Sequence, residues 1–364
     1  MAPVKAREIL SLIDSFAPFS LALDWDNSGF QAGDPEKPVR VVAVSLDPTL
    51  SAVETALGKG ADLLVAHHPL VFKPLNGVVA GRPQTGALIR AIQAELPVIS
   101  AHTNWDAAGM GPALAELLEL KVEGFLEPAS ADLLKIVVFV PEGSERQVSE
   151  ALFEAGAGQI GAYSRCSFRA AGLGGFLPPP DASPYIGVSG VYTETAEYRL
   201  EAVLPASLRD RCAAAARAAH PYEEPAFEFY RMEATGTFGF GIAGVWDPPR
   251  PPLPWLAARL GVRDLAVAGP VPPSVRRAAL LPGAGASYLP QAKGAGCEVL
   301  ITGDLTHHQA LLAEELGIGV ISAGHHETET PGVRRLADEL SARAPELVFH
   351  LLPGASPLDA WRAP

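Results

Sequence analysis

The sequence predicts an α/β protein in which two similar α/β halves are interrupted by a smaller α+β unit. Short apolar runs alternate with helical patterns toward both ends of the chain, and the middle of the chain has a different texture. Such runs, with helices between them, are typical of parallel strands that are buried on both faces of a sheet. The chain has 364 residues, 48% hydrophobic and 19% charged, which is the composition of a folded protein with room for two or three domains.

The first half, residues 1–130, begins with apolar residues at helical spacing over Ile9–Phe16, among charged neighbours. This pattern predicts an amphipathic helix and not a signal peptide. The apolar runs that follow predict three parallel strands, Val39–Leu46, Leu63–Ala66 and Pro97–Ala101. Because ligands of parallel sheets bind beyond the carboxyl ends of the strands, we expect functional residues directly after each run.

The second half, residues 234–364, returns to the same alternation. Its predicted strands are Leu265–Ala268, Ala278–Leu281, Glu298–Ile301, Gly319–Ser322 and Leu347–Leu352. The segment Val320–His325 is similar to Val98–His102 of the first half, which favours an internal duplication. The alternative is that any two buried strands look alike.

The segment between the halves, residues 131–233, has the order strand, helix, strand, strand, helix, strand. The predicted elements are Leu134–Val140, Glu145–Ala155, a strand near Gly161–Ala170, Tyr198–Leu204, Leu208–Ala219 and Ala226–Tyr230. This order is that of a ferredoxin-like sandwich, so we expect an inserted small domain that divides the outer domain in sequence and not in space. A Gly- and Pro-rich loop is expected over Gly172–Gly190.

Two motifs of this insert are interpreted as structural. The prolines of His220–Pro225 fix a turn between a helix and a strand. The glycines Gly172, Gly174 and Gly175 lack the spacing of a nucleotide-binding loop and do not open a helix, so we expect no phosphate site there.

The charge balance and the cysteines disfavour several classes of function. With 28 Lys and Arg against 41 Asp and Glu, the net charge of −13 disfavours binding to nucleic acid or to anionic membranes. No apolar run approaches the roughly 18 residues that span a membrane. Cys166, Cys212 and Cys297 lie far apart without a CxxC pair, which predicts no disulfide framework and fits a cytoplasmic protein.

Seven of the nine histidines fall at or just after the carboxyl ends of predicted strands. They are His67, His68, His102, His307, His308, His325 and His326. A single histidine of this kind is more often a satisfied core residue than a ligand. The set as a whole favours a site that several strand ends build together.

Carboxylates accompany these histidines. Asp106 follows His102 in the same segment, and Glu329 follows His325 by four residues, so a helix would place the latter two on one face. Imidazole and carboxylate ligands without thiolates suit Zn, Fe, Mn or a similar divalent ion. Two carboxylates and three or more histidines exceed what one tetrahedral ion needs, which favours two ions bridged by a carboxylate and a water.

Several spaced motifs resemble those of one known family. They are Asp26–Gly29, Ala66–Pro69, Ser100–Ala107, Gly303–Asp304 with His308, Gly324–Glu329 and, in the insert, Tyr163–Phe168, Pro184–Gly187 and His220–Pro225. The chain resembles the GTP cyclohydrolase I type 2 family, also called Nif-three-like, in its long bacterial form with an inserted PII-like domain. The resemblance extends nearly from end to end of the chain.

The resemblance implies a site with two divalent metal ions per chain in a cleft between the two halves. The implied ligands are His67, His68, Asp106, His325 and Glu329, with Glu329 as the bridge. It also implies a homohexameric ring whose sites face an interior cavity. This sequence departs from the family pattern at Trp105, at Thr306-His307 and at Pro331, and we expect Trp105 to narrow the pocket.

Other polar residues are predicted to orient the ligands or to hold a metal-bound water. They are Asp26, Asn27, His102, Thr103, Asn104, Asp304 and His308. Ordinary helix capping is the alternative for those that stand between a strand and a helix. His326 is adjacent to a ligand, and its direction is left open.

The residues predict a metal-dependent hydrolase, since paired divalent ions activate water. The resemblance implies one specific reaction, hydrolytic opening of the imidazole ring of GTP, although a phosphoester or another small metabolite fits the residues equally well. The alternative is a non-catalytic, metal-loaded regulatory or scaffold ring whose insert binds a ligand or partner. A third hypothesis, nucleic-acid processing, is disfavoured by the net charge of −13.

Overall fold

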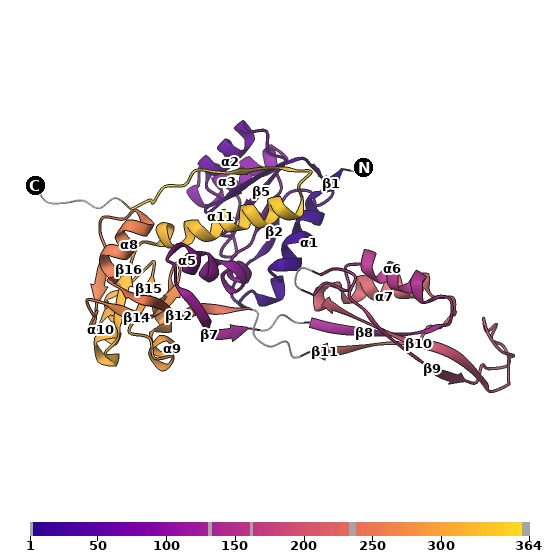
Figure 1. Ribbon diagram of the computed structural model, residues 1–364. Helices are drawn as coiled ribbons and strands as arrows, with labels where there is room; N and C mark the ends of the chain where they lie inside the picture. Colours follow the sequence, from indigo (N-terminus) through magenta and orange to yellow (C-terminus); the bar gives the residue numbers. More distant parts are fainter. Residues whose placement is uncertain (1–2, 130–132, 161–162, 233–237, 359–364) are drawn as a thin grey trace, which may run out of the picture. The chain divides into compact units, whose positions relative to one another are not determined.

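The computed structural model describes residues 3–129, 133–160, 163–232 and 238–358. These residues form two compact units, of which unit 1 comprises Met1–Ala129 with Gly236–Pro364, and unit 2 comprises Ser130–Thr235 (Figure 1). Each unit has its own buried apolar core. Within the described ranges, no helix is both long enough and apolar enough to cross a membrane.

The first sheet of unit 1 has the strand order β17-β4-β5-β6-β2. Its strands are β2 (Gly29–Ala32), β4 (Val41–Ser45), β5 (Leu63–Ala66), β6 (Val98–Ser100) and β17 (Val348–Leu351). The strands β4, β5 and β6 are parallel and almost entirely buried, as their apolar runs predict. β2 pairs with β6 in the antiparallel direction and closes one edge.

The second sheet of unit 1 has the order β13-β16-β15-β14-β12-β7. Its strands are β7 (Lys121–Ala129), β12 (Phe238–Arg250), β13 (Ala266–Ala268), β14 (Val275–Leu281), β15 (Val299–Thr302) and β16 (Gly319–Ser322). Here too three parallel strands, β14 to β16, have an antiparallel edge strand beyond the third. The two sheets therefore share this arrangement of four strands, β4-β5-β6-β2 in the first and β14-β15-β16-β13 in the second, as an internal duplication predicts.

The two halves of the chain exchange strands between these sheets. β7, from the first half, pairs with β12 of the second, and β17, which the sequence pattern assigned to the second half, lies parallel to β4 of the first. Neither β7 nor β12 was predicted. β7 is mostly exposed, and β12 contains glycines and prolines, so neither forms a continuous apolar run.

Helices cover the two sheets and connect their parallel strands. They are α1 (Ala6–Phe16), α2 (Leu50–Gly58), α3 (Pro83–Gln93), α4 (Thr103–Trp105), α5 (Gly111–Leu117), α8 (Pro252–Leu260), α9 (Leu289–Gly294), α10 (His307–Leu316) and α11 (His325–Arg343). Minor elements are β1 (Val4–Lys5), which pairs with β3 (Pro38–Val39), the 3₁₀ turns Phe19–Leu21 and Gly285–Tyr288, and a π-helical turn, Asp106–Met110. The predicted amphipathic helix is α1, which buries Ile9 and Ile13.

The helix α11 joins the two halves of unit 1. It begins directly after β16 of the second sheet, and its residues Val333, Leu336 and Leu340 pack in the same core as Ile9 and Ile13 of the first half. In Figure 1 it is the yellow helix that runs between the elements of the two sheets. The first turns of α11, from the second half of the sequence, are thereby brought to the strand ends of the first.

Unit 2 is a four-stranded antiparallel sheet of order β11-β8-β10-β9 with two helices on one face (Figure 1). Its elements are β8 (Leu133–Pro141), α6 (Glu145–Glu154), β9 (Phe168–Phe176), β10 (Thr193–Pro205), the 3₁₀ turn Ala206–Leu208, α7 (Arg209–Ala219) and β11 (Phe227–Met232). Val148 and Leu152 of α6 and Cys212 of α7 pack on Ile136 and Leu200 of the sheet. The chain order is strand, helix, strand, strand, helix, strand, as the pattern predicts.

One strand of unit 2 was predicted in the wrong place. The expected strand near Gly161–Ala170 begins only at Phe168, while Gly161 and Ala162 lie outside the described residues. The strand then continues through the glycines that were expected to form a loop, pairing Gly172 with Glu197 and Gly174 with Thr195. Glycine has a low strand propensity, so the sequence pattern indicates a loop. Pairing with β10 nevertheless holds this segment in a strand.

Candidate metal centre

Four histidines and two carboxylates from separate strand ends meet in unit 1. His67 and His68 follow β5, and His102 follows β6, while His325 opens α11 after β16. The ring centroids of His67 and His68 lie 4.9 Å apart, those of His67 and His102 5.1 Å, and those of His68 and His325 5.5 Å. Asp106, the first residue of the π-helical turn, completes the cluster with Glu329.

Each of the four imidazoles uses Nδ1 to donate a hydrogen bond to an oxygen. His67 donates to the Ala101 carbonyl at 2.8 Å, His68 to Asp47 at 2.8 Å, His102 to Asp26 at 2.7 Å and His325 to Asp304 at 2.6 Å. Carbonyl and carboxylate oxygens only accept, so the proton of the neutral ring is on Nδ1 and the lone pair is on Nε2. Metal-ligating histidines in proteins are usually held in this way.

Glu329 lies at the centre of these Nε2 atoms. Its Oε1 is 3.2 Å from Nε2 of His325 and 3.9 Å from Nε2 of His67, and its Oε2 is 3.3 Å from Nε2 of His68. Asp106 Oδ1 is 3.6 Å from Nε2 of His67. The side chain of Glu329 is only 6% exposed, and that of His67 is fully buried. A buried carboxylate among imidazole nitrogens needs positive charge beside it, either from protons on the rings or from a metal ion that replaces them.

The donor set fits a divalent metal ion. Among the described residues, Nε2 of His67 is a buried polar atom without a hydrogen-bond partner, and Oε2 of Glu329 is buried 3.3 Å from Nε2 of His68. Two groups have ligand atoms close enough to share an ion, namely His67 with His68 and His102, and His68 with His325 and Glu329. Imidazole nitrogen and carboxylate oxygen are ligands that Zn, Fe and Mn accept. The cluster can therefore hold a metal ion.

The electrostatics of the cluster favour added positive charge. Burial tends to lower the pKa of His68, but hydrogen bonds to Asp47 and Glu329 outweigh it and raise this pKa to about 10. The hydrogen bond to Glu329 raises the pKa of His325 to about 9. Burial opposes ionisation of Glu329, yet His325 and His68 hold its pKa well below its usual range. In contrast, burial lowers the pKa of His67 to about 3, so that ring stays neutral and able to bind a metal.

The cluster opens into a cavity of about 640 Å³. His68, His102, Asp106, His325 and Glu329 contribute to its wall. The remaining wall is largely apolar and includes Trp25, Phe72, Met110, Phe240, Leu281 and Tyr288. This size and composition are those of a small-molecule site.

Comparison with known proteins identifies the family. A model of the Duf34/NIF3 (NGG1p interacting factor 3) family matches residues 4–353. The chain belongs to this family. A NIF3 relative from Bacillus subtilis (strain 168), called GTP cyclohydrolase 1 type 2 homolog, is 36% identical over 330 residues, which cover 89% of this chain and 88% of the relative. A relative of the same name from Mycobacterium bovis is 37% identical over 352 residues, covering 93% and 91%.

Solved structures give the same result for the fold. The crystal structure of a Bacillus cereus protein related to NIF3 is similar to this chain with a TM-score of 0.79 and 33% sequence identity, and covers 99% of this chain and 100% of its own. A Staphylococcus aureus protein gives a TM-score of 0.69 at 26% identity over 99% of this chain and 100% of its own. The predicted membership of the family is thus confirmed, and the chain has a NIF3 mixed α/β fold.

The NIF3 site brings together all five residues predicted as ligands and four of those predicted to support them. Asp26 and Asp304 hold His102 and His325, respectively. Thr103 donates its hydroxyl to Asp26 at 2.6 Å. His102 takes a more central place than predicted, since its ring lies beside those of His67 and His68 and it lines the cavity.

Three residues predicted as support lie elsewhere in the structure. The Asn27 side chain donates to the Val71 carbonyl at 2.6 Å, and that of Asn104 donates to the Ala17 carbonyl at 2.8 Å, so both fasten backbone. His308 is exposed in the first turn of α10 beside His307. None of the three contributes to the described wall of the cavity. Their proximity to motif residues in the sequence does not aim their side chains at the cluster.

The expectation that Trp105 narrows the pocket is wrong. Trp105 is 2% exposed, its indole donates to the Gly332 carbonyl at 3.0 Å, and its ring packs edge-on against Phe16. The aromatic residues at the cavity are instead Trp25 and Phe72, with 60% and 48% of their surface exposed. Helical geometry turns Trp105 into the core while Asp106, the next residue, faces the cluster.

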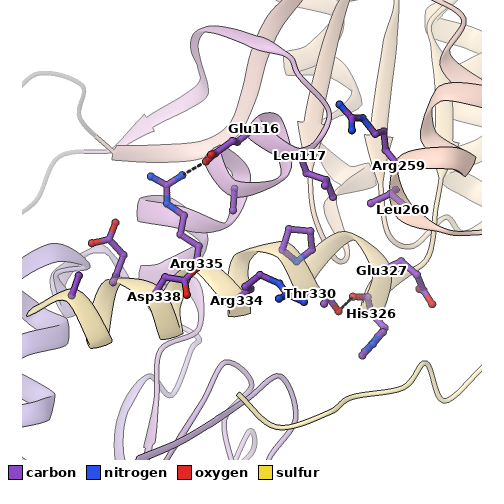
Figure 2. A pocket seen from close by; sticks show the side chains of 14 residues that line it. Glu116, Leu117, Arg259, Leu260, His326, Glu327, Thr330, Arg334, Arg335 and Asp338 are labelled. Atoms are coloured by element: carbon purple, nitrogen blue, oxygen red, sulfur yellow. Dashed lines mark hydrogen bonds and ion pairs between the residues drawn. The ribbon is translucent and has the colours of Figure 1, made fainter. Parts of the chain in front are cut away.

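His326 points away from the histidine and carboxylate cluster. It lines a different pocket of about 770 Å³, on the side of α11 that faces α5 and α8. Figure 2 shows His326 beside Thr330, whose hydroxyl donates to the His326 carbonyl, and shows the ion pair of Arg335 with Glu116 farther along α11. The lining of this pocket includes arginines of α8 and α11 and acidic residues of α5 and α11. Among the described residues, it contains no group of ligand atoms close enough to hold a metal ion.

Two residues of the site were missed by the sequence analysis. Asp47 orients His68, and it follows the strand β4 directly, so the rule that found the histidines also applied to it. Gly283 follows β14 with φ +64°, and a Cβ atom there would overlap with the Glu329 carboxylate. A Pro-Gly pair after a strand predicts only a turn, so the sequence carries no signal for this contact.

Proposed function

We propose that this chain is a metal-dependent hydrolase with two divalent metal ions held by His67, His68, Asp106, His325 and Glu329. The observation that carries the proposal is the buried Nε2 atom of His67, which has no hydrogen-bond partner and lies 3.6 Å from Asp106 Oδ1 and 3.9 Å from Glu329 Oε1. The central place of Glu329 between three Nε2 atoms supports its role as the bridge. The ions' identity is Zn, Fe, Mn or similar, as the donor set allows.

When bound, such a pair of ions supplies an activated water and polarises an oxygen of the substrate. The chain's own residues hold the ligands and move a proton. Asp47 and Asp304 keep His68 and His325 in one ring orientation. His102 lines the cavity with Nδ1–H bonded to Asp26, so its Nε2 can take a proton from a water or a substrate there.

The wall of the cavity suits a planar ring. Trp25 and Phe72 lie edge to face with centroids 6.0 Å apart, and both are close to the ring of His102. The described residues of the wall include no Lys or Arg, so the cavity fits a heterocyclic base better than a triphosphate. The relatives' name, GTP cyclohydrolase 1 type 2 homolog, makes hydrolytic opening of the imidazole ring of GTP the first reaction to test.

The test compares metal content and turnover in the wild type and in Glu329→Gln, purified without chelator or nickel affinity. We expect about two divalent ions per chain in the wild type and one or fewer in the variant, with GTP hydrolysis lost in the variant. His308→Gln, which changes an exposed histidine outside the cluster, is the matched control and keeps both properties. A wild type that binds no metal after reloading contradicts the site, and metal binding without turnover of any purine contradicts the reaction.

We also propose the finer organisation that the family resemblance implies. Unit 2 is assigned as a ferredoxin-like, PII-like domain, which its strand order β11-β8-β10-β9 supports. We assign the chain to the cytoplasm and its assembly to a homohexameric ring. We expect its substrate to be a small molecule, and we expect it not to bind nucleic acid. Sedimentation equilibrium is expected to give six chains, and a monomer at working concentration removes the ring.

One observation favours a second function, a regulatory or scaffold role. Unit 2 has a separate core and a cavity of its own, and the described residues of this cavity include no group of metal-ligand atoms. Under this alternative, Glu329→Gln leaves binding of the ligand or partner to unit 2 unchanged although metal is lost, and no substrate turnover depends on Glu329. Under the hydrolase proposal, the same variant abolishes turnover of the substrate.

A further inference from the structure

Unit 2 contains a cavity of about 390 Å³ that the metal centre does not use. It lies between the strand β9, the loop after it and the turn that follows α7. Its lining residues combine aromatic residues and prolines with three acidic residues, Glu197, Glu223 and Glu224. All its lining residues belong to unit 2, so the cavity is complete within that unit.

Three of the aromatic residues in the wall, Phe176, Tyr185 and Tyr222, lie close to one another. The ring centroid of Tyr222 lies 6.2 Å from that of Phe176 and 6.1 Å from that of Tyr185, with interplanar angles of 50° and 49°. The rings are thus tilted toward one another and not stacked. Pro178 and Pro184 add apolar surface beside them. Aromatic faces carry partial negative charge, so tilted rings around a cavity favour a cationic guest.

Negative charge at the wall adds to this preference. Tyr222 donates its hydroxyl to Oε1 of Glu197 at 3.0 Å, which fixes the Glu197 carboxylate beside the ring. The Glu197 side chain lies over Gly174, where a Cβ atom would overlap with it. Glycine at this position of β9 therefore makes room for the carboxylate. The pairing of β9 with β10, where a loop was predicted, thus places Gly174 beside the Glu197 carboxylate.

Positive charge is scarce at this wall. None of the described lining residues is Lys or Arg. Arg199 is not a lining residue, although its guanidinium lies 5.9 Å from the ring of the lining residue Phe139, and it is paired with Glu201 at 2.7 Å. His220 packs against Tyr222, and burial lowers its pKa, so it adds no cation at neutral pH. The acidic residues are therefore the charged residues that line the cavity, and they favour a positively charged ligand.

We propose that this cavity binds a small organic cation with an ammonium or trimethylammonium group. The rings of Phe176, Tyr185 and Tyr222 surround the cationic group, and Glu197 provides the countercharge. A metal ion fits this wall less well, because it needs several oxygen ligands at short distance and most of the wall is aromatic and apolar. The ligand site of unit 2 is independent of the metal chemistry proposed for unit 1.

The test measures binding of choline to the full chain by calorimetry or ligand-observed NMR, against 3,3-dimethylbutan-1-ol, which has the same shape without the charge. We expect saturable binding of choline and at least about tenfold weaker binding of the neutral alcohol, since cation–π and charge interactions are lost. Tetramethylammonium is expected to compete with choline. Equal binding of the two probes, or no saturable binding of either cation, overturns the proposal.

Two variants locate the binding site. Tyr222→Ala is expected to weaken choline binding about tenfold, and Glu197→Gln, which keeps an acceptor for the Tyr222 hydroxyl, to weaken it several-fold without affecting the alcohol. Tyr230→Ala, at an exposed tyrosine of β11 outside the cavity wall, is the control and keeps wild-type affinity. Thermal unfolding confirms that each variant is folded. Choline affinity that is unchanged in both Tyr222→Ala and Glu197→Gln overturns the proposal.

Discussion

The α-carbon of Gly283 packs against the carboxylate of Glu329 so closely that no Cβ atom fits between them. Gly283 lies in the turn after β14, and its amide donates to the Thr328 hydroxyl at 3.1 Å. The turn of the second sheet therefore fixes the first turns of α11. The position of the central carboxylate of the cluster depends on a residue that ligates nothing.

Gly283→Ala is expected to weaken metal binding about 10- to 100-fold, as changes behind a ligand typically do. The added Cβ displaces Glu329, and φ +64° costs an alanine about 1–2 kcal/mol more. Titration with Zn²⁺ or Mn²⁺ measures the change. Gly294→Ala, in the helix α9 with open space around its Cβ position, is the control and keeps wild-type affinity. Equal affinities in the two variants contradict the contact.

Asp47→Asn tests whether the acceptors behind the histidines matter. The amide replaces the anionic partner of His68 Nδ1, so we expect metal affinity to fall about 10- to 100-fold while the fold is retained. Asp210→Asn, at a 95% exposed side chain, serves as the control. The idea fails if the loss in Asp47→Asn is no greater than in Asp210→Asn.

The raised pKa values predict that metal binding releases protons. His68 and His325, with pKa values of about 10 and 9, carry protons at pH 7.5 that a metal must displace. Calorimetry in buffers of different ionisation enthalpy is expected to show about two protons released, declining as the pH rises through 9 and 10 while affinity increases. His308→Gln should release the same number. No buffer dependence contradicts the assigned protonation.

The same shifts affect the stability of the metal-free chain. Both histidines have folded pKa values above the usual 6.5, so their contribution to the free energy of unfolding is fully present below pH 6.5. It is lost as the pH rises from 6.5 through 9 and 10. Urea unfolding of the metal-free protein across this range, compared with His68→Ala, measures this contribution. The prediction is contradicted if the free energy of unfolding changes with pH between 6.5 and 10 as steeply in His68→Ala as in the wild type.

Substitutions of two tryptophans near the site are expected to affect different properties, stability in one case and substrate binding in the other. Trp105→Ala is expected to cost about 3–5 kcal/mol of unfolding free energy, because it removes a buried ring and a hydrogen bond to Gly332. Trp25→Ala changes an exposed residue, so stability is expected to change by about 0.5 kcal/mol or less while substrate binding weakens. Chemical denaturation and substrate affinity, measured on both variants, separate the two roles.

His102→Gln distinguishes a proton carrier from a ligand. If His102 accepts a proton at Nε2, the variant keeps about two ions per chain and loses turnover, since glutamine offers no titrating nitrogen. The matched control is Asn27→Ala, whose side chain fastens the Val71 carbonyl away from the cavity. Loss of one ion in His102→Gln shows a ligand instead.

The sequence alone predicted the central strands and the residues that follow them. Val41–Ser45, Leu63–Ala66 and Gly319–Ser322 are continuous apolar runs, because strands buried on both faces admit little else. Since parallel strands end at one edge, the histidines after them were expected to meet. The motifs indicated the family and, by resemblance, the five residues that are predicted as ligands.

Tertiary structure decided what depends on pairing and on side-chain direction. Whether β17 joins the first or the second sheet is a choice between two free edges that its own residues do not specify. Trp105 and Asp106 are adjacent in sequence, yet one is in the core and the other at the cluster, because a helical turn sends neighbours about 100° apart. Gly283 and Glu329 meet only because α11 packs across both halves, and local sequence carries no record of so distant a contact.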